Sequence, residues 1–164
     1  MEGIPVIRRT LTILEPLFSE IIIAGWPAGD PLPRGVHTVA DNYTGIGPLG
    51  GIEAALRVCE SPYLFVFGCD MPWLSEDMIR KQADDFLRAP ADILAARIGG
   101  LFEPLHSLYS RSILTSLAGY IEGGGSPTVF DFYPVVKTRY HDLPVTDETR
   151  KALTNINRPE DIIR

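Results

Sequence analysis

One carboxylate stands at the end of the most apolar segment of the chain. Residues 63–67 form a continuous aromatic and branched run, and Asp70 follows three positions later. Such a run predicts a strand buried on both faces, as in a parallel α/β sheet, and Pro72 prevents the strand from continuing. Asp70 would then lie at the carboxyl edge of a sheet, where open α/β folds bind ligands. Two interpretations stay open, a ligand to a metal or substrate and a turn-initiating aspartate.

A glycine-rich loop is the second candidate for binding. Residues 42–51 read Asn-Tyr-Thr-Gly-Ile-Gly-Pro-Leu-Gly-Gly and lead into a helix predicted at residues 52–59. Glycines let a ligand approach the main chain closely, and the free N–H groups of the helix can bind an anion or a nucleoside carbonyl. The loop has neither the Gly-Lys-Ser/Thr of a P-loop nor the dinucleotide pattern Gly-x-Gly-x-x-Gly. From spacing alone, a structural glycine turn explains it equally well.

Four further polar side chains lie at the ends of predicted elements. Asp41 terminates a strand, so it and Asp70 could bind a cation at one sheet edge, or each could cap a turn. His106 begins a short strand and could bind substrate or transfer a proton, although a lone histidine is more often a hydrogen-bonded structural group. Asn155 and Asn157 could contact a ring system or a metal, or could cap the helical turn that follows.

Composition places the chain among ordinary globular proteins. Its 164 residues suffice for one domain with a full hydrophobic core. A net charge of −6 without basic clusters argues against nucleic acid as the main partner, whereas mononucleotides can bind through backbone amides and a metal. No apolar run is long enough to span a membrane and no secretory signal is visible, so we expect a cytoplasmic protein. Cys59 and Cys69 fit buried, reduced thiols, and His141 fits a surface position.

Strands alternate with helices along the chain, which predicts an α/β fold with a largely parallel sheet. Strands are predicted at residues 21–25, 36–40, 63–67, 92–96, 106–109 and 135–140. Helices are predicted at residues 5–17, 52–59, 75–87 and 112–120, with helical turns at 129–132 and 159–164. The first regular element is a helix, whereas a right-handed β-α-β unit needs a strand before it. We therefore expect the first strand of the sheet to be absent.

Taken together, these motifs resemble those of the molybdenum cofactor guanylyltransferases, the molybdopterin-guanine dinucleotide biosynthesis protein A family. The resemblance rests on Asp41 and on four segments: Gly-Pro-Leu-Gly-Gly at 47–51, Gly-Cys-Asp-Met-Pro at 68–72, Glu-Pro-Leu-His-Ser-Leu-Tyr at 103–109 and Asn-Ile-Asn-Arg-Pro-Glu-Asp at 155–161. It implies a single domain, residues 1–164, with the three-layer Rossmann-like nucleotidyltransferase fold. The opening strand of the family and its signature, Leu-Ala-Gly-Gly-x-Ser-x-Arg-Met-Gly-x-Asp-Lys, have no counterpart here. The domain is therefore expected to be N-terminally incomplete, with reduced activity.

The resemblance also implies a reaction, the Mg²⁺-dependent transfer of GMP from GTP to the terminal phosphate of molybdopterin with release of pyrophosphate. The acceptor phosphate would attack directly, so positioning and electrostatics would determine the rate. By the same resemblance the catalytic and metal-binding residue is Asp70; the nucleotide-binding residues are Asp41, Pro48, Leu49, Gly50, Gly51 and Asp70; and the acceptor-binding residues are His106, Asn155 and Asn157. Molybdoenzymes or cofactor-carrier proteins would be partners. The alternatives are a sister nucleotidyltransferase that uses CTP or a sugar phosphate, and a non-catalytic homologue that binds the cofactor or a partner protein.

Overall fold

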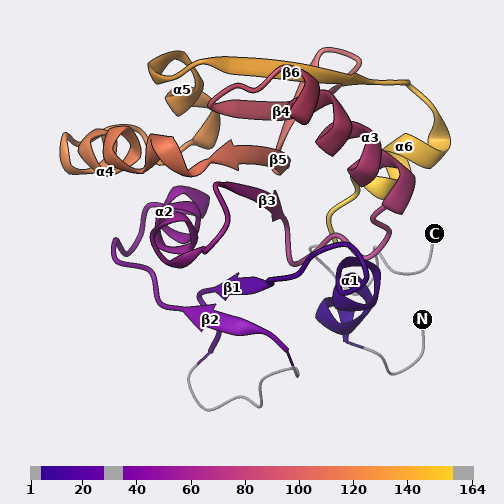
Figure 1. Cartoon of the computed structure of the whole chain (residues 1–164), viewed down its shortest axis with the longest axis horizontal. Helices are drawn as coiled ribbons and strands as arrows, with labels where there is room; N and C mark the ends of the chain where they lie inside the picture. Colours follow the sequence, from indigo (N-terminus) through magenta and orange to yellow (C-terminus); the bar gives the residue numbers. More distant parts are fainter. Residues whose placement is uncertain (1–4, 28–34, 157–164) are drawn as a thin grey trace.

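The computed structural model describes residues 5–27 and 35–156 and arranges them in three layers (Figure 1). The strands are β1 (Ile22–Ala24), β2 (His37–Val39), β3 (Tyr63–Phe67), β4 (Ile93–Ile98), β5 (Leu101–Ser110) and β6 (Thr138–Leu143). The α-helices are α1 (Val6–Leu14), α2 (Pro48–Val58), α3 (Glu76–Arg88), α4 (Leu114–Glu122), α5 (Val129–Phe132) and α6 (Asp147–Ala152), and 3₁₀ turns form at Arg111–Ile113 and Tyr133–Val135. The predicted α/β class is confirmed.

The described strands form two separate sheets. β1 and β2 pair in parallel, and the other four pair in the order β3-β5-β4-β6. In this larger sheet β5 is antiparallel to both of its neighbours, whereas β4 and β6 are parallel. β3, β4 and β6 therefore run in one direction. The prediction of a largely parallel sheet is confirmed, with β5 as the exception.

Strand β5 is longer than predicted and continues through a proline. We expected a strand at residues 106–109, but the strand runs from Leu101 to Ser110. The pairing with β4 shifts register between Ala95 and Ala96, which leaves a bulge in β5 around Pro104. A bulge tolerates a residue that cannot donate a ladder hydrogen bond. Pro104 thus bends β5 without ending it.

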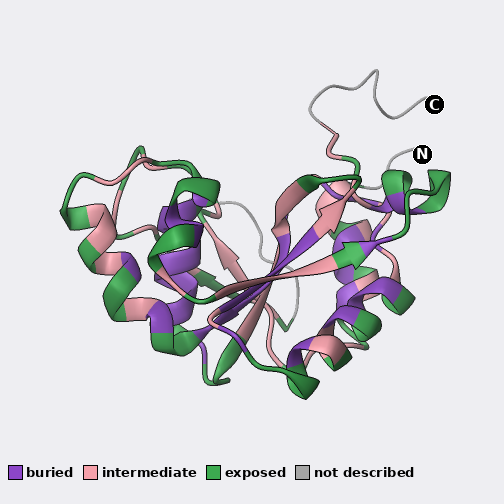
Figure 2. Ribbon diagram, turned by 90° about the horizontal axis from the view of Figure 1, so that it is seen from above, coloured by how far each residue is buried: buried purple, intermediate pink, exposed green. Residues whose placement is uncertain are grey.

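Helices cover both faces of the larger sheet, and each face has its own buried core (Figure 2). On one face α2, α4 and α5 pack against the sheet through a core that includes Leu49, Ile52, Leu56, Leu117 and Phe132. On the other face lie α1, α3 and α6, whose buried side chains include Leu14, Ile79 and Ala152. Alternate side chains of β3 enter the two cores, as the strand period of two requires: Leu64 and Val66 join the first, Phe65 and Phe67 the second.

Helix α2 begins earlier than predicted. We expected the glycine-rich loop to reach residue 51, but α2 starts at Pro48. Proline suits the first turn of a helix because its fixed φ is helical and its missing N–H is not needed there. Gly50 and Gly51 therefore belong to the start of α2, which brings this helix terminus directly into the loop.

Capping explains two other helices. The predicted start of α3 is confirmed, since Ser75 Oγ accepts a hydrogen bond from the N–H of Met78 at 3.4 Å. Helix α6 was not predicted; Thr146 Oγ1 caps it by accepting the N–H of Thr149 at 3.2 Å. β6 starts at Thr138, three residues later than expected, because a 3₁₀ turn precedes it. The helical turn predicted at residues 159–164 lies outside the described residues.

Two expectations from composition can be compared with the structure. Cys59 is buried, as predicted, but Cys69 is exposed, so the prediction that both thiols are buried is wrong for Cys69. In the described parts of the chain, no helix is long and apolar enough to cross a membrane.

Candidate active site

Asp70 lies just beyond the carboxyl end of β3, as the apolar run predicted. Its carboxylate folds back over Gly68, because a Cβ atom built on Gly68 would lie only 2.6 Å from Asp70 Oδ1. The Asp70 carbonyl accepts a hydrogen bond from the N–H of Ile156 at 2.8 Å. Thr10 Oγ1, from α1, donates to the next carbonyl, that of Met71, at 3.2 Å. Segments far apart in the sequence thus hold the main chain that carries this carboxylate.

Asn155 is the residue next to the one that contacts Asp70. It immediately precedes Ile156, whose N–H holds the Asp70 carbonyl. Asn155 Oδ1 is buried and has no hydrogen-bond partner among the described residues. A buried acceptor without a partner is uncommon and invites a ligand or a cation. Asn157, the other predicted asparagine, lies outside the described residues.

Glu103 is a carboxylate near Asp70 that the sequence interpretation did not assign to the site. The antiparallel pairing of β3 with β5 brings the Gly68 N–H within 3.0 Å of the Leu105 carbonyl, which directs Glu103 toward Asp70. Burial raises the pKa of the Glu103 carboxyl, and the charge of Asp70 raises it further, while the N–H of Leu105 opposes the rise. Glu103 therefore places a second carboxylate at this edge.

Asp41 lies beside the start of α2. A Cβ atom on Gly50 would lie 3.5 Å from Asp41 Oδ2, and one on Gly51 would lie 3.8 Å from Asp41 Oδ1. Asp41 Oδ1 is buried and has no partner in the described part of the chain. The structure therefore brings the predicted carboxylate and the predicted glycines together. Pro48 and Leu49, the other predicted nucleotide-binding residues, form the first two positions of the same helix.

The two halves of the candidate site border one cavity of about 500 Å³, which lies between β1 and β3. Gly51, beside Asp41, and Gly68, beside Asp70, both line it. Helices α1 and α2 flank the gap between the two strands (Figure 1). Residues 64–67 of β3 are only partly buried as a result. Both faces of β3 pack against a core, as predicted, but full burial is not reached, because β3 is an edge strand among the described strands.

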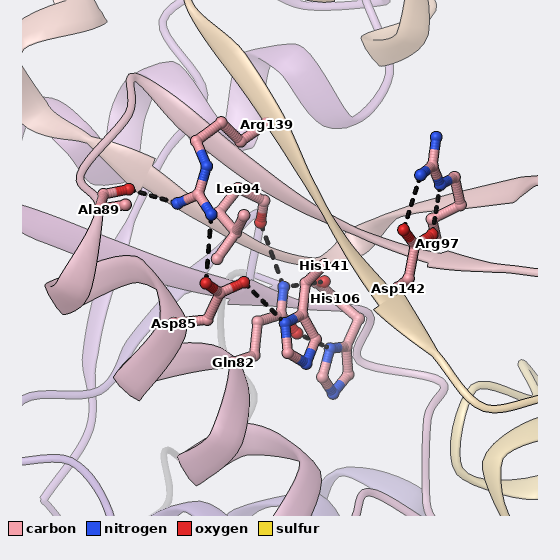
Figure 3. Close-up of polar contacts among 9 residues, drawn as sticks. All are labelled: Gln82, Asp85, Ala89, Leu94, Arg97, His106, Arg139, His141 and Asp142. Atoms are coloured by element: carbon pink, nitrogen blue, oxygen red, sulfur yellow. Dashed lines mark hydrogen bonds and ion pairs between the residues drawn. The ribbon is translucent and has the colours of Figure 1, made fainter.

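His106, predicted to bind the acceptor, lies in the interior of the protein (Figure 3). Its Nδ1 is 2.9 Å from Gln82 Oε1, and Gln82 Nε2 donates to the carbonyls of His106 and Leu94 at 3.1 Å. Its ring meets Phe65 and Phe67 edge-on. Burial lowers the pKa of His106 to about 4, so the ring is neutral near pH 7. Its contact with the acceptor stays a prediction, and its described contacts are those of a core residue.

A second cluster of polar side chains connects α3 to β6 (Figure 3). His141 Nδ1 lies 2.9 Å from Asp85 Oδ2, and Arg139 Nη2 lies 3.1 Å from Asp85 Oδ1. The hydrogen bond from His141, followed by the one from Arg139, lowers the pKa of Asp85. The expectation that His141 is a surface residue is therefore wrong. In the sequence, this contact could have been recognised from the polar residues that α3 carries on its buried side.

Metal binding by protein side chains alone is not supported by the described residues. Among them, no three His, Cys, Asp or Glu side chains gather in a way that could hold a metal ion. Mg²⁺ is usually bound by one or two carboxylates together with substrate phosphates. The edge formed by Asp70, Glu103 and Asn155 is compatible with that kind of site.

Comparison with known proteins identifies the family. The model of the MobA-like NTP transferase domain matches residues 1–137 of the chain. The chain belongs to this family. It is also 30% identical to a protein of Pelotomaculum thermopropionicum described as a probable molybdenum cofactor guanylyltransferase, over 96% of the chain and 77% of that protein. A relative from Carboxydothermus hydrogenoformans with the same description is 29% identical, over 95% and 79%.

Solved structures agree with this MobA-like assignment at the level of the fold. Molybdopterin-guanine dinucleotide biosynthesis protein A of Archaeoglobus fulgidus has a TM-score of 0.77 and 22% identity, over 96% of this chain and 81% of that one. The 2-C-methyl-D-erythritol 4-phosphate cytidylyltransferase of Thermus thermophilus has a TM-score of 0.69 and 13% identity, over 96% and 85%. The family resemblance inferred from the sequence motifs is thus confirmed. The chain therefore belongs to a family of transferases.

Replacement of Gly50 by alanine tests how the start of α2 packs against the glycine-rich loop. The new Cβ would lie 2.8 Å from the Tyr43 carbonyl oxygen, a main-chain atom that can move only with its loop. We expect the free energy of unfolding to fall by about 1–3 kcal/mol in urea denaturation. Gly119→Ala is the control, because nothing lies within 4 Å of a Cβ there. In the interior of α4 it should stabilise by up to about 1 kcal/mol. Equal effects of the two substitutions would contradict this account.

Proposed function

We propose that the chain transfers GMP from GTP to molybdopterin, forming molybdopterin guanine dinucleotide and pyrophosphate. Membership of the family supports the class of reaction. The observation that supports the site is a pair of buried oxygens, Asp41 Oδ1 and Asn155 Oδ1, which have no partner among the described residues. One lies in each half of the candidate site, where a nucleotide and an acceptor would each bring hydrogen-bond donors or a cation.

The Asp41 half is proposed to bind guanosine. A carboxylate accepts hydrogen bonds, and guanine offers N–H donors on its Watson–Crick edge, including the N2 amine. The start of α2, with Gly50 and Gly51 at its N-terminus, presents backbone N–H groups that suit the guanine carbonyl. Pro48 and Leu49 would shape the same pocket. Guanine offers two adjacent donors, N1–H and the N2 amine, to one carboxylate, whereas cytosine offers only its N4 amine, so GTP is expected to be preferred to CTP.

The Asp70 half is proposed to bind Mg²⁺ and the phosphates. Asp70 and Asn155 supply a carboxylate and an amide oxygen, the kinds of ligand that Mg²⁺ prefers, and the charge of Asp70 reaches Glu103. When bound, Mg²⁺ neutralises phosphate charge. The protein holds the Asp70 carboxylate over Gly68 and its carbonyl on Ile156, so its ligand oxygen is positioned in advance. The acceptor phosphate attacks directly, and positioning by these residues contributes most of the rate.

The acceptor, the cellular location and the protein partners complete the proposed function. Asn155 and Asn157 would contact molybdopterin, and His106 would support the strand behind them. We further propose that residues 1–164 belong to one nucleotidyltransferase-like domain that acts in the cytoplasm. Its product would pass to molybdoenzymes or cofactor-carrier proteins.

Nucleotide competition tests the proposed specificity. A fluorescent guanine nucleotide bound to the purified chain with Mg²⁺ is displaced by GTP or by CTP. GTP should compete on the order of 10-fold better, since a mismatched polar edge costs about 1–3 kcal/mol. Stronger competition by CTP would assign the chain to a sister nucleotidyltransferase. If neither nucleotide displaces the probe, the proposed guanosine site is wrong.

Gly68→Ala tests the position of the Asp70 carboxylate. The Cβ would lie 2.6 Å from Asp70 Oδ1, so the flexible carboxylate must move while the main chain stays in place. We expect the free energy of unfolding to change by less than about 1 kcal/mol. The affinity for Mn²⁺ in the presence of GTP, measured by electron paramagnetic resonance, should fall about 10-fold. Unchanged Mn²⁺ affinity would show that Asp70 is not the metal ligand. Gly119→Ala serves as the matched control.

A further inference from the structure

The loop between β2 and α2 carries Asp41 and packs along one face of α2 (Figure 1). Gly50 and Glu53 are three positions apart in this helix, so they share a face. A Cβ atom on Gly50 would lie 2.8 Å from the Tyr43 carbonyl oxygen and 3.5 Å from Asp41 Oδ2. Residues 41–43 therefore lie along the same face of α2 as Glu53.

Glu53 is a fully buried carboxylate with partners at the surface. Its Oε2 accepts a hydrogen bond from Asn42 Nδ2 at 2.9 Å, and its Oε1 accepts one from Arg57 Nε at 2.9 Å. Asn42 is exposed, as is half of the Arg57 side chain. Taking a carboxylate out of water is costly, and an apolar residue in place of a buried ion pair is often equally stable. Stability alone therefore does not explain Glu53, whereas a fixed position for Asn42 does.

Asn42 directly follows Asp41, so its bond to Glu53 restrains the main chain that carries the Asp41 carboxylate. Asp41 Oδ1 is buried and has no hydrogen-bond partner among the described residues. On the other side of Asn42, Tyr43 Oη donates to Glu122 Oε1 at the end of α4, at 2.6 Å. The loop is thus tied to α2 and to α4 immediately after a buried oxygen that is left free.

We propose that Glu53 is a positioning residue for guanine recognition, which holds Asn42 so that the Asp41 carboxylate is in place before the nucleotide binds. The choice of guanine as the ligand rests on the proposed function. A loop that is ordered in advance spares the ligand the cost of ordering it, which raises affinity. When the bond to Glu53 is broken, the loop occupies the binding position for only part of the time. The apparent affinity then falls by the same fraction.

An exchange of donor and acceptor between Asn42 and Glu53 tests this role. Asn42→Asp puts a carboxylate of the same shape against Glu53 Oε2, so the two side chains repel each other. Adding Glu53→Gln supplies an N–H donor to the new carboxylate, while the amide oxygen can still accept from Arg57. The single variant should therefore be impaired and the double variant restored. Loss of an unrelated structural contact would not give this rescue.

The first readout is the affinity for a fluorescent guanine nucleotide in the presence of Mg²⁺. Asn42→Asp should weaken binding about 10-fold, and the double variant Asn42→Asp/Glu53→Gln should bind within about threefold of the unaltered chain. Ser116→Asp is the matched control, because it adds the same charge at an exposed position of α4 outside the loop. It should leave the affinity unchanged. Equal affinities of Asn42→Asp and the control, or a double variant no better than the single one, would overturn the proposal.

The second readout is the backbone order of the nucleotide-free chain, which separates this inference from the proposed function. Asn42→Asp should lower the NMR order parameters of the Asn42 and Tyr43 amides from about 0.85 toward about 0.6, and the double variant should restore them. If the unaltered chain does not bind the guanine nucleotide, the proposed guanosine site is wrong. Order parameters that Asn42→Asp leaves unchanged would overturn the role of Glu53, whether or not the nucleotide binds.

A second substitution covers the case in which Asn42→Asp prevents folding. Asn42→Ala removes the bond to Glu53 at an exposed residue without adding charge. It should lower the same order parameters and weaken nucleotide binding roughly threefold. No change in either quantity would overturn the proposal.

Discussion

Replacing Gln82 with alanine is expected to lower the free energy of unfolding by about 4 kcal/mol. The Gln82 side chain is fully buried, and its amide bonds to the carbonyls of Leu94 and His106 and to His106 Nδ1 (Figure 3). The substitution leaves these groups without partners and opens a cavity under the sheet. Each unsatisfied buried group costs about 1–3 kcal/mol, and loss of the side-chain volume adds to that cost. Urea denaturation at neutral pH measures the effect.

A neighbouring lysine supplies the control for Gln82→Ala. Lys81 is on the solvent side of α3 with 69% of its side chain exposed, and it pairs only with the exposed Asp77 among the salt bridges found. Lys81→Ala should change the free energy of unfolding by less than about 0.5 kcal/mol, because exposed ion pairs contribute little. A loss below about 1 kcal/mol for Gln82→Ala would contradict the role of this amide in holding α3 to the sheet.

Acidification is expected to destabilise the protein by about 3 kcal/mol through His106. Burial lowers the pKa of His106 from its ordinary value of 6.5 to about 4, so the unfolded state binds a proton at pH values where the folded state does not. The stability contributed by the neutral ring is fully present above pH 6.5 and is lost as the pH falls from 6.5 to about 4. A difference of this size in pKa corresponds to about 3 kcal/mol.

Two variants separate this effect from other titrations. In His106→Gln the loss of stability between pH 6.5 and about 4 should largely disappear. Glu103 acts in the opposite sense, because burial raises its pKa and protonation on acidification favours the folded state. Glu103→Gln should therefore steepen the loss. Asp85, whose pKa is lowered, loses its contribution only below its ordinary value of 3.8. An identical pH profile for His106→Gln and the unaltered chain would contradict the assignment.

The fold was predictable wherever local chemistry dominates. The apolar run before Asp70 identified β3 and its carboxyl end, and the Ser75 cap identified the start of α3. β5 was predicted too short because Pro104 normally ends a strand, and only the pairing with β4 shows that a bulge accepts it. The reversed direction of β5 is likewise a property of the sheet and leaves no trace in the periodicity of one strand.

The candidate site was predictable in its parts and not in its arrangement. Asp41 and Asp70 were predicted as site residues because each follows a predicted strand. The glycines that lie beside them belong to sequence motifs that were also recognised. The closeness of Asn155 to Asp70 depends on a hydrogen bond from Ile156, which no local pattern encodes. His106 was expected near the acceptor because the sequence does not reveal that Gln82 covers it.

The cavity beside β3 could not be read from the periodicity of any one segment. The β-α-β rule calls for a strand before α1, and among the described strands the edges of β1 and β3 face an apolar cavity. The rule could not show that both halves of the candidate site border this cavity.

Product formation by the purified chain tests the central claim most directly. The chain is incubated with GTP, Mg²⁺ and molybdopterin, and the products are identified by mass spectrometry, with CTP in a parallel reaction. The account predicts molybdopterin guanine dinucleotide and pyrophosphate, formed only with GTP and Mg²⁺. Asp70→Asn should lower the rate by about 100-fold or more, since it removes the charge at the proposed metal site. Absence of the guanine dinucleotide, a cytosine product in its place, or an unchanged rate in Asp70→Asn would contradict the account.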